Sequence, residues 1–444
     1  MSKLFVILLT WLLLISSSVQ TMAYATQFAD DGETIRLHWR TKLIPITFST
    51  SLTAPNLSFR AESDVKGAIE RSLATWERSA DIKFQVAWSD KQTVSPSGKF
   101  GDGTSLVTVA QTAENLQLFG GDATEVSART RIFFSRKGFI TEADIVLNPY
   151  EQFSTDGSIG TFDFEATLTH EIGHLLGLEH SSVTGATMHE HQGKNGIYNL
   201  PAYSSRTLAE DDVSGIRALY GANPTDEENC CGIIGGKLIL ANGKPAKDFQ
   251  VWAEEAESGR VMAEVVTDAD GNYRIEGLRV GLYKIFTQNV SQKSEKSYSV
   301  EELGEVGVIK GKTQNLQRKL KNNARHFDAQ YIGFNGQISE LAVPINGGKS
   351  YLIYVGGKNL DADKISIGFN SPYLSVTPES LANHDYGAGI SVVSFEVKVD
   401  QEIPLGEYSF FIKNKGQEKQ FAVGGLTVET VVNPWNSHLL LTND

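Results

Sequence analysis

Residues 170–180 read HEIGHLLGLEH, and this stretch dictates much of the local structure around it. His170 and His174 are four residues apart, so on an α-helix they project from nearly the same face, one turn apart. Gly177 can take the left-handed conformation that ends a helix, and the chain can then bring His180 back toward the first two imidazoles. Three imidazoles at this spacing predict a metal site, and they leave a fourth coordination position open, as in catalytic zinc sites.

Glu171 is offset from His170 by about 100° of helix rotation, so its carboxylate is expected beside the metal rather than on it. A general base for an activated water is needed at that position. The alternative is a group of histidines that cap a helix or bond to backbone. Four of the nine histidines fall within residues 170–189, and this clustering argues against that alternative.

Three successive segments carry a family resemblance: HEIGHLLGLEHSS, then Ala186-Thr187-Met188, then LAEDDVSGIRALYG. Together they resemble the matrixin branch of the metzincin zinc endopeptidases, in its bacterial type, over about residues 33–221. The resemblance implies an α+β catalytic domain with a mixed twisted sheet, an active-site helix and a C-terminal helix. It also implies hydrolysis of peptide bonds in protein or peptide substrates.

The same resemblance assigns roles to individual residues. It implies that one catalytic zinc ion is bound by His170, His174 and His180, that Glu171 is the general base, and that Met188 forms the turn beneath the metal. An extended substrate would add as a strand beside ARTRIFFS, residues 128–135, which is the expected sheet edge.

Two family features are missing from the sequence. No cysteine precedes the motif, so a cysteine-switch propeptide is not expected. The His/Asp-rich loop that holds a structural zinc and calcium in many animal matrixins is not recognisable between residues 89 and 148. One zinc ion is therefore the expected cofactor, and Ca²⁺ is left open without a supporting motif.

Two segments beyond the motif are further candidates for a part in the site. His189 and His191 follow the turn methionine, and that position favours surface or supporting roles over metal ligation. Pro201-Ala202-Tyr203 resembles the segment that lines the specificity pocket in matrixins, but it lies farther from Met188 than in the family.

The N-terminus predicts export. Lys3 precedes an apolar run at residues 4–15, and Ala23-Tyr24-Ala25 is a cleavage signal, so residues 1–25 are interpreted as a secretory signal peptide. A membrane anchor is the alternative, but the run is shorter than the roughly 20 residues that span a bilayer. The mature chain is expected to be secreted or extracellular, or periplasmic in a Gram-negative cell, with no membrane span.

The 444 residues exceed what one hydrophobic core usually organises, so several domains are expected. A formal net charge of −13 argues against a nucleic-acid surface or an anionic membrane as partner. The sequence leaves the oligomeric state open.

Hydrophobic periodicity predicts the elements of the first domain. Val65, Ile69, Leu73 and Trp76 recur at helical spacing, and they predict an amphipathic helix. Further helices are expected at 163–176 and 209–220, and strands at 37–50, 81–88, 128–135 and 143–148. Residues 89–127 receive no assignment.

The polar stretch from Ala222 to Asn229 is the strongest domain boundary, and all-β patterns with Gly, Asn and Asp turns follow it. The β region at 233–320 contains a G-x-P turn, T-D-x-D-G-x-Y-x-I and G-L-x-x-G-x-Y, and it resembles a carboxypeptidase regulatory-like (transthyretin-like) β-sandwich. The β region at 327–430 resembles an immunoglobulin-like sandwich. Spacer roles are favoured for both over dedicated ligand sites. The predicted boundaries are signal peptide 1–25, catalytic domain 26–222, linker 223–232, β-sandwiches 233–320 and 327–430, and tail 431–444.

Two local features between residues 230 and 271 allow more than one interpretation. Asp268-Ala269-Asp270-Gly271 superficially resembles a calcium loop, but the positions that would need Gly and Glu hold Tyr273 and Arg279, so a type I′ hairpin turn is favoured. Cys230 and Cys231 are adjacent, and a strained local ring, two free thiols and an intermolecular bridge all remain open.

The leading hypothesis is a secreted zinc endopeptidase with two appended β domains. The alternative is a surface-binding or adhesive protein whose peptidase domain is inert. An inert domain would normally have lost a metal ligand or Glu171, and all four of these residues are present.

Overall fold

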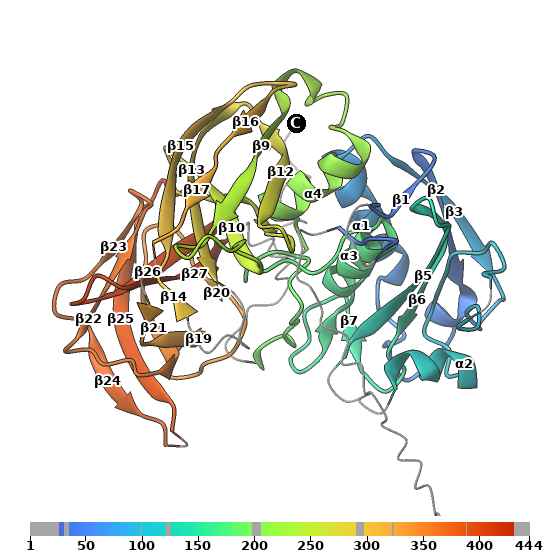
Figure 1. Ribbon diagram of the computed structural model, residues 1–444. Coiled ribbons are helices and arrows are strands. Elements are labelled where there is room, and N and C mark those ends of the chain that lie inside the picture. The colour runs from blue at the N-terminus through green and yellow to red at the C-terminus, as the bar shows by residue number, and fades with distance from the viewer. Residues whose placement is uncertain are drawn as a thin grey trace, which may run out of the picture.

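The computed structural model describes residues 26–30, 35–98, 100–120, 126–197, 206–289, 297–321, 324–387 and 389–429. These residues form three units in chain order (Figure 1): a blue-to-green unit that carries the labelled helices, a yellow unit and an orange-to-red unit, the last two built from strands. The predicted signal peptide, the C-terminal tail and Pro201-Ala202-Tyr203 lie outside the described residues. No helix of the described residues is long and apolar enough to cross a membrane.

The first unit contains a mixed sheet in the order β1-β6-β4-β2-β3. Strand β5 lies outside this order and pairs with β6. All pairings are parallel except that of β5 with β6, which is antiparallel. The predicted edge position of residues 128–135 is therefore confirmed. The strands are β1 His38–Trp39, β2 Leu43–Ser49, β3 Lys83–Ser89, β4 Leu106–Thr108, β5 Ala128–Phe134 and β6 Phe139–Leu147. Residues 37–50 thus form two strands rather than the predicted single one.

Helices α1 (Val65–Ser79) and α3 (Phe164–Leu175) pack against each other and share one core with the sheet. The four periodic apolar residues of α1 are all buried, as predicted. The indole N–H of Trp76 donates to the Thr169 carbonyl of α3 at 2.9 Å. The remaining elements of this unit are α2 Ala113–Leu116, β7 Phe153–Ser154, β8 Phe162–Asp163, α4 Glu210–Tyr220 and short 3-10 helices at Thr50–Leu52 and Gln117–Phe119.

The second unit packs two sheets around one core, in the orders β11-β10-β13-β15 and β12-β9-β16, with β17 also on β9. Its strands are β9 Cys230–Ile239, β10 Phe249–Glu255, β11 Val261–Val266, β12 Asn272–Arg279, β13 Gly281–Asn289, β14 Ser297–Tyr298, β15 Glu301–Val308, β16 Thr313–Asn315, β17 Arg318–Lys319 and β18 Ala324–Arg325. β14 pairs with β18. β9 begins at Cys230, inside the predicted linker 223–232, and a 3-10 helix at Glu227–Asn229 precedes it.

Two expectations about this unit are settled by the structure. Cys230 and Cys231 are joined to each other as a disulfide, which selects the local ring among the three alternatives. The prediction of a type I′ hairpin turn at Asp270-Gly271 was wrong. Only Gly271 has a positive φ, of 76°, whereas that turn needs two, and the flanking strands β11 and β12 belong to different sheets.

The third unit also packs two sheets around one core, in the orders β19-β21-β25-β23 and β20-β27-β26-β22, with β24 beside β25. Its strands are β19 Asp328–Phe334, β20 Val343–Pro344, β21 Ser350–Lys358, β22 Ile365–Phe369, β23 Leu374–Val376, β24 Ala382–Asp385, β25 Ser391–Val399, β26 Gly406–Asn414 and β27 Lys419–Val428.

Candidate metal centre

Helix α3 carries the first two histidines, and all of its residues are buried. Its N-cap, Asp163, accepts a hydrogen bond from the Ala166 N–H at 3.0 Å and pairs with Arg206. The helix ends as the sequence predicted, because Gly177 has a φ of 100°. A Cβ at Gly177 would overlap the Leu37 carbonyl oxygen, so the chain needs glycine at this turn for two reasons.

The structure brings His170, His174 and His180 together, and one nitrogen from each lies within 4.8 Å of the others. His170 Nδ1 lies 2.7 Å from the Thr187 carbonyl oxygen, and His174 Nδ1 lies 2.9 Å from the Leu178 carbonyl oxygen. When each Nδ1–H donates to its carbonyl, the Nε2 lone pair is left for a metal. An all-imidazole donor set with fixed tautomers fits zinc. Among the described residues, no second cluster of this kind was found.

Burial lowers the pKa values of the three imidazoles, which favours the neutral form that binds a metal. It lowers the pKa of His170 to about 4 and, together with the neighbouring histidines, the pKa of His180 to about 2. The pKa of His174 is lowered for the same reason. All three rings are therefore neutral at pH 7, which is the form that coordinates a metal.

Glu171 lies beside this cluster and is buried, with 4% of its surface exposed. Burial raises the pKa of its carboxyl, while the neighbouring His174 and a hydrogen bond from Thr130 oppose that rise. Thr130 Oγ1 donates to Glu171 Oε2 at 2.5 Å. Because Thr130 belongs to β5, the carboxylate is tied to the edge strand of the sheet.

Met188 packs against helix α3 at Gly173 and is fully buried. Asp212 of α4 holds the backbone around it: the carboxylate accepts N–H bonds from Thr187 and Ala209 at 2.9 Å and from Met188 at 3.1 Å. The sequence suggested only that acidic residues at 210–212 suit a helix N-terminus. It gave no sign that Asp212 is buried, and burial together with Asp211 raises the pKa of Asp212 to about 7.

Two histidines on a helix, a third histidine from the loop that follows it, a buried glutamate after the first histidine and a methionine packed against the same helix thus lie close together. Residues 38–221 match the matrixin family. Metalloendoproteinase 1 of Glycine max is 48% identical over 177 residues, which are 37% of this chain and 48% of that protein. Metalloendoproteinase 4-MMP of Arabidopsis thaliana is 27% identical over 194 residues, or 43% of this chain and 49% of that protein.

The chain spans about half the length of these matrixin relatives. Matrilysin of Mus musculus matches a shorter stretch, at 37% identity over 75 residues, which are 17% of this chain and 26% of that protein. Among solved structures, BcpA, the major pilin subunit of Bacillus cereus, aligns with this chain at 17% identity. The alignment covers 43% of this chain and 66% of the BcpA chain. Its TM-score of 0.18 is too low to support any inference.

His189 and His191 lie outside the three-histidine cluster of the matrixin segment. Both contact the third unit instead: His189 Nε2 lies 3.1 Å from the Glu340 carbonyl oxygen, and His191 Nε2 lies 3.0 Å from Glu340 Oε2. The preference for surface or supporting roles over metal ligation agrees with this arrangement, but the contact of both histidines with a β unit could not be foreseen from the sequence.

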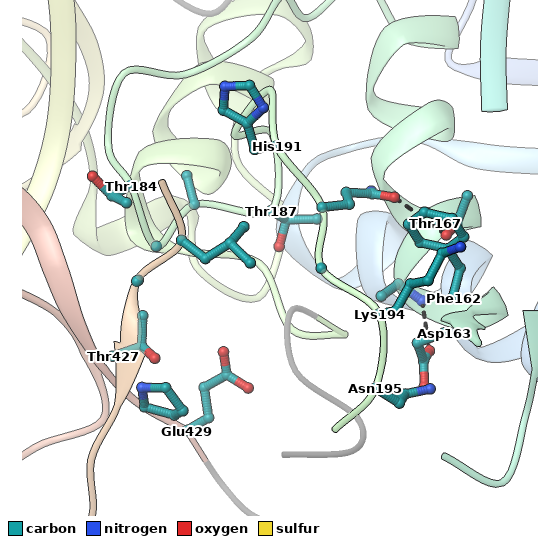
Figure 2. Close-up of a pocket in the computed structure, with 18 residues that line it drawn as sticks. Phe162, Asp163, Thr167, Thr184, Thr187, His191, Lys194, Asn195, Thr427 and Glu429 are labelled. Carbon is teal, nitrogen blue, oxygen red and sulfur yellow. Dashed lines mark hydrogen bonds between the residues drawn. The ribbon is translucent and has the colours of Figure 1, made fainter. Parts of the chain in front are cut away.

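Two hollows beside the three-histidine cluster are shared with the third unit. A groove of about 660 Å³ runs from His180 and His189 to residues of β19 and β27, including Gln330 and Gln420. A smaller pocket of about 70 Å³ lies between Thr167 of α3 and the end of β27 (Figure 2). Figure 2 shows Thr184 and Thr187 on one wall of this pocket, with Thr427 and Glu429 below them. The third unit therefore lies against the metal centre.

Proposed function

We propose that this protein is a secreted zinc endopeptidase that hydrolyses peptide bonds of proteins with Glu171 as the general base. The main support is the convergence of three neutral imidazoles beside a buried carboxylate. The matrixin match and the relatives named metalloendoproteinases support a zinc metalloprotease. The N-terminal sequence at 1–25 supports secretion.

The residues of the centre divide the chemistry between them. A zinc ion held by the three imidazoles would supply Lewis acidity, which polarises a carbonyl group and lowers the pKa of nearby water. Glu171 would take a proton from that water at a carboxylate oxygen and later give it to the leaving amine. The raised pKa of Glu171 suits this role, because the carboxylate must hold the proton between the two transfers. Thr130 would keep the carboxylate oriented.

The edge strand β5 would bind the substrate. Within the described residues β5 pairs only with β6, so its other side faces no strand and can add an extended peptide. Thr130 lies on this strand, so the substrate backbone would run past the Glu171 carboxylate. The groove beside His180 would continue this path.

A paired assay tests the proposal. The purified protein should hold one zinc ion and cleave an unfolded protein, while Glu171→Ala should keep the zinc and lose cleavage by about 10²–10⁴-fold or more. Equal inactivity of both proteins on a broad peptide library would favour the alternative of a surface-binding protein with an inert peptidase domain. Absence of zinc from the wild-type protein would reject the proposed cofactor.

A further inference from the structure

The segment from His180 to His189, termed the third-ligand loop, connects the third histidine to the turn methionine. We propose that the two C-terminal β units are part of the metal centre, because they hold the third-ligand loop in the conformation that places His180. This inference rests on the proposed function of the centre as a zinc site. It replaces the spacer role expected for both units.

The tip of the loop is buried in an apolar cluster that belongs to all three units. Val183 is fully buried there against Trp252 and Phe286 of the second unit and Phe421 and Val423 of the third. The rings of Trp252, Phe286 and Phe421 lie 5.3–5.5 Å apart, so they form a compact aromatic triangle. A surface loop would not place a fully buried valine among aromatic rings from two other units.

The backbone of the loop is also satisfied from outside its own unit. Ser182 N–H donates to Glu264 Oε1 of β11 at 3.0 Å, and Thr184 N–H donates to the Val423 carbonyl of β27 at 3.0 Å. The two β units therefore provide acceptors for two half-buried N–H groups of the loop. The chain approaches β27 so closely at Gly185 that a Cβ there would overlap Thr427.

Both ends of the loop are connected to the metal ligands. At the start, Ser181, next to His180, donates from Oγ to Asp211 Oδ2 at 2.6 Å, and Asp211 Oδ1 accepts the N–H of Glu264 at 2.6 Å. At the end, the Thr187 carbonyl orients His170 through Nδ1. A shift of the loop would therefore disturb two of the three ligands.

His180 depends on the loop more than the other ligands depend on their surroundings. His170 and His174 are fixed by a helix with every residue buried, whereas the His180 side chain is 23% exposed. Groups that support a metal ligand from outside typically change metal affinity 10–100-fold when they are lost. Glu264, a residue of another unit, is such a positioning residue for His180.

Full-length variants test this inference. Glu264→Leu removes the acceptor of Ser182 N–H, and Glu264→Gln retains it as an amide oxygen. Glu276→Leu is the matched control, because Glu276 pairs with Arg36 across the same two units without contacting the loop. Zinc affinity is measured by competition with a chromophoric chelator. We expect Glu264→Leu to raise the Kd for zinc about 10–100-fold, and the other two variants to stay close to wild type.

A second measurement tests the order of the loop independently of zinc binding. In the metal-free proteins, amide hydrogen exchange in peptides covering residues 180–189 should be faster in Glu264→Leu than in wild type, Glu264→Gln or Glu276→Leu. If Glu264→Leu fails to fold, Val183→Ala, which opens space in the aromatic cluster, should show the same two effects.

The outcomes distinguish the inference from the proposed function. Equal zinc affinity in wild type, Glu264→Leu and Val183→Ala would overturn the inference while leaving the zinc site standing. An equal loss in Glu276→Leu would also overturn it, because the effect would then reflect general loosening of the units. A wild-type protein that binds no zinc would instead reject the proposed function.

Discussion

Met188 occupies the space that a side chain on Gly173 would need. A Cβ built on Gly173 would overlap the Met188 sulfur and would come within 3.0 Å of Trp76 on α1. Gly173 directly precedes His174, so helix α3 can rest on the methionine turn only because this position lacks a side chain. The relationship connects the packing of Trp76 on α1, Gly173 on α3 and Met188.

Gly173→Ala should therefore destabilise the protein by about 1–3 kcal/mol through overpacking, despite the better helix propensity of alanine. Zinc affinity should fall as well, because the helix or the turn must move. Urea unfolding and chelator competition measure the two effects. Gly307→Ala is the control, since an added Cβ there would meet no atom within 4 Å. Equal unfolding midpoints for the two variants would contradict this account of Gly173.

Thr130→Val should move the acidic limb of the pH profile of kcat/KM to higher pH. The hydroxyl donates to the ionised form of Glu171 and so lowers its pKa, and removal of that bond lets burial raise the pKa further. Since the base must be ionised to accept a proton, activity should be lost most at low pH. Thr141→Val, on the neighbouring strand with its hydroxyl bonded to the Phe133 carbonyl, should leave the profile unchanged. A profile for Thr130→Val that overlays wild type would refute the role of this bond.

Zinc removal should lower the thermal unfolding midpoint. A ligand that binds only the folded state at 100 times its Kd stabilises that state by about 2.7 kcal/mol. Differential scanning calorimetry with zinc and with a chelator should reveal the shift in wild type and in Glu171→Gln, but not in His180→Ala. A zinc-dependent shift that survives in His180→Ala would indicate that the stabilising ion binds elsewhere.

The metal-free protein should lose stability as pH rises from about 6.5 to 8.5. Burial and the nearby Asp211 raise the pKa of Glu264 to about 8 and of Asp212 to about 7, far above the values of the unfolded chain. The folded state thus holds protons that the unfolded state has released, and stability falls with rising pH until these groups have ionised in the folded state as well. The histidines act in the opposite direction only below about pH 6.5, because their pKa values are lowered.

Urea midpoints at the two pH values provide the measurement. Glu264→Gln should reduce the drop, since an amide does not ionise. A midpoint that is higher at pH 8.5 than at pH 6.5 would show that the buried carboxyls do not dominate in this range.

The part of the site that sequence could predict is the part encoded by local spacing. The helical spacing of His170 and His174 fixes their relation before any tertiary contact forms, and Gly177 marks the turn that returns the third ligand. In the same way, the four periodic apolar residues of α1 predicted its buried face, which the structure confirms.

Contacts between distant segments left no local pattern to detect. Glu264 and Val423 lie far along the chain from the loop that they hold, and a glutamate in a strand gives no sign of being buried. The boundary at 222–229 looked like a linker from its polar composition, yet Asp226 pairs with both Arg217 and Arg279. At Gly271 the local turn chemistry correctly predicted a positive φ. The prediction of a hairpin was wrong, because the pairing of strands depends on the whole sheet and β11 and β12 belong to different sheets.

The hydrogen bond from Thr184 to Val423 also sets an order of events during biosynthesis. A ribosome releases the metal ligands and Glu171 long before it releases β27, the last strand of the described chain. Contacts of such high contact order form late, after the intervening chain has emerged and folded. A nascent molecule would thus expose its histidines without the support that aligns them, and the candidate metal centre would be complete only after β27 has been released and has folded.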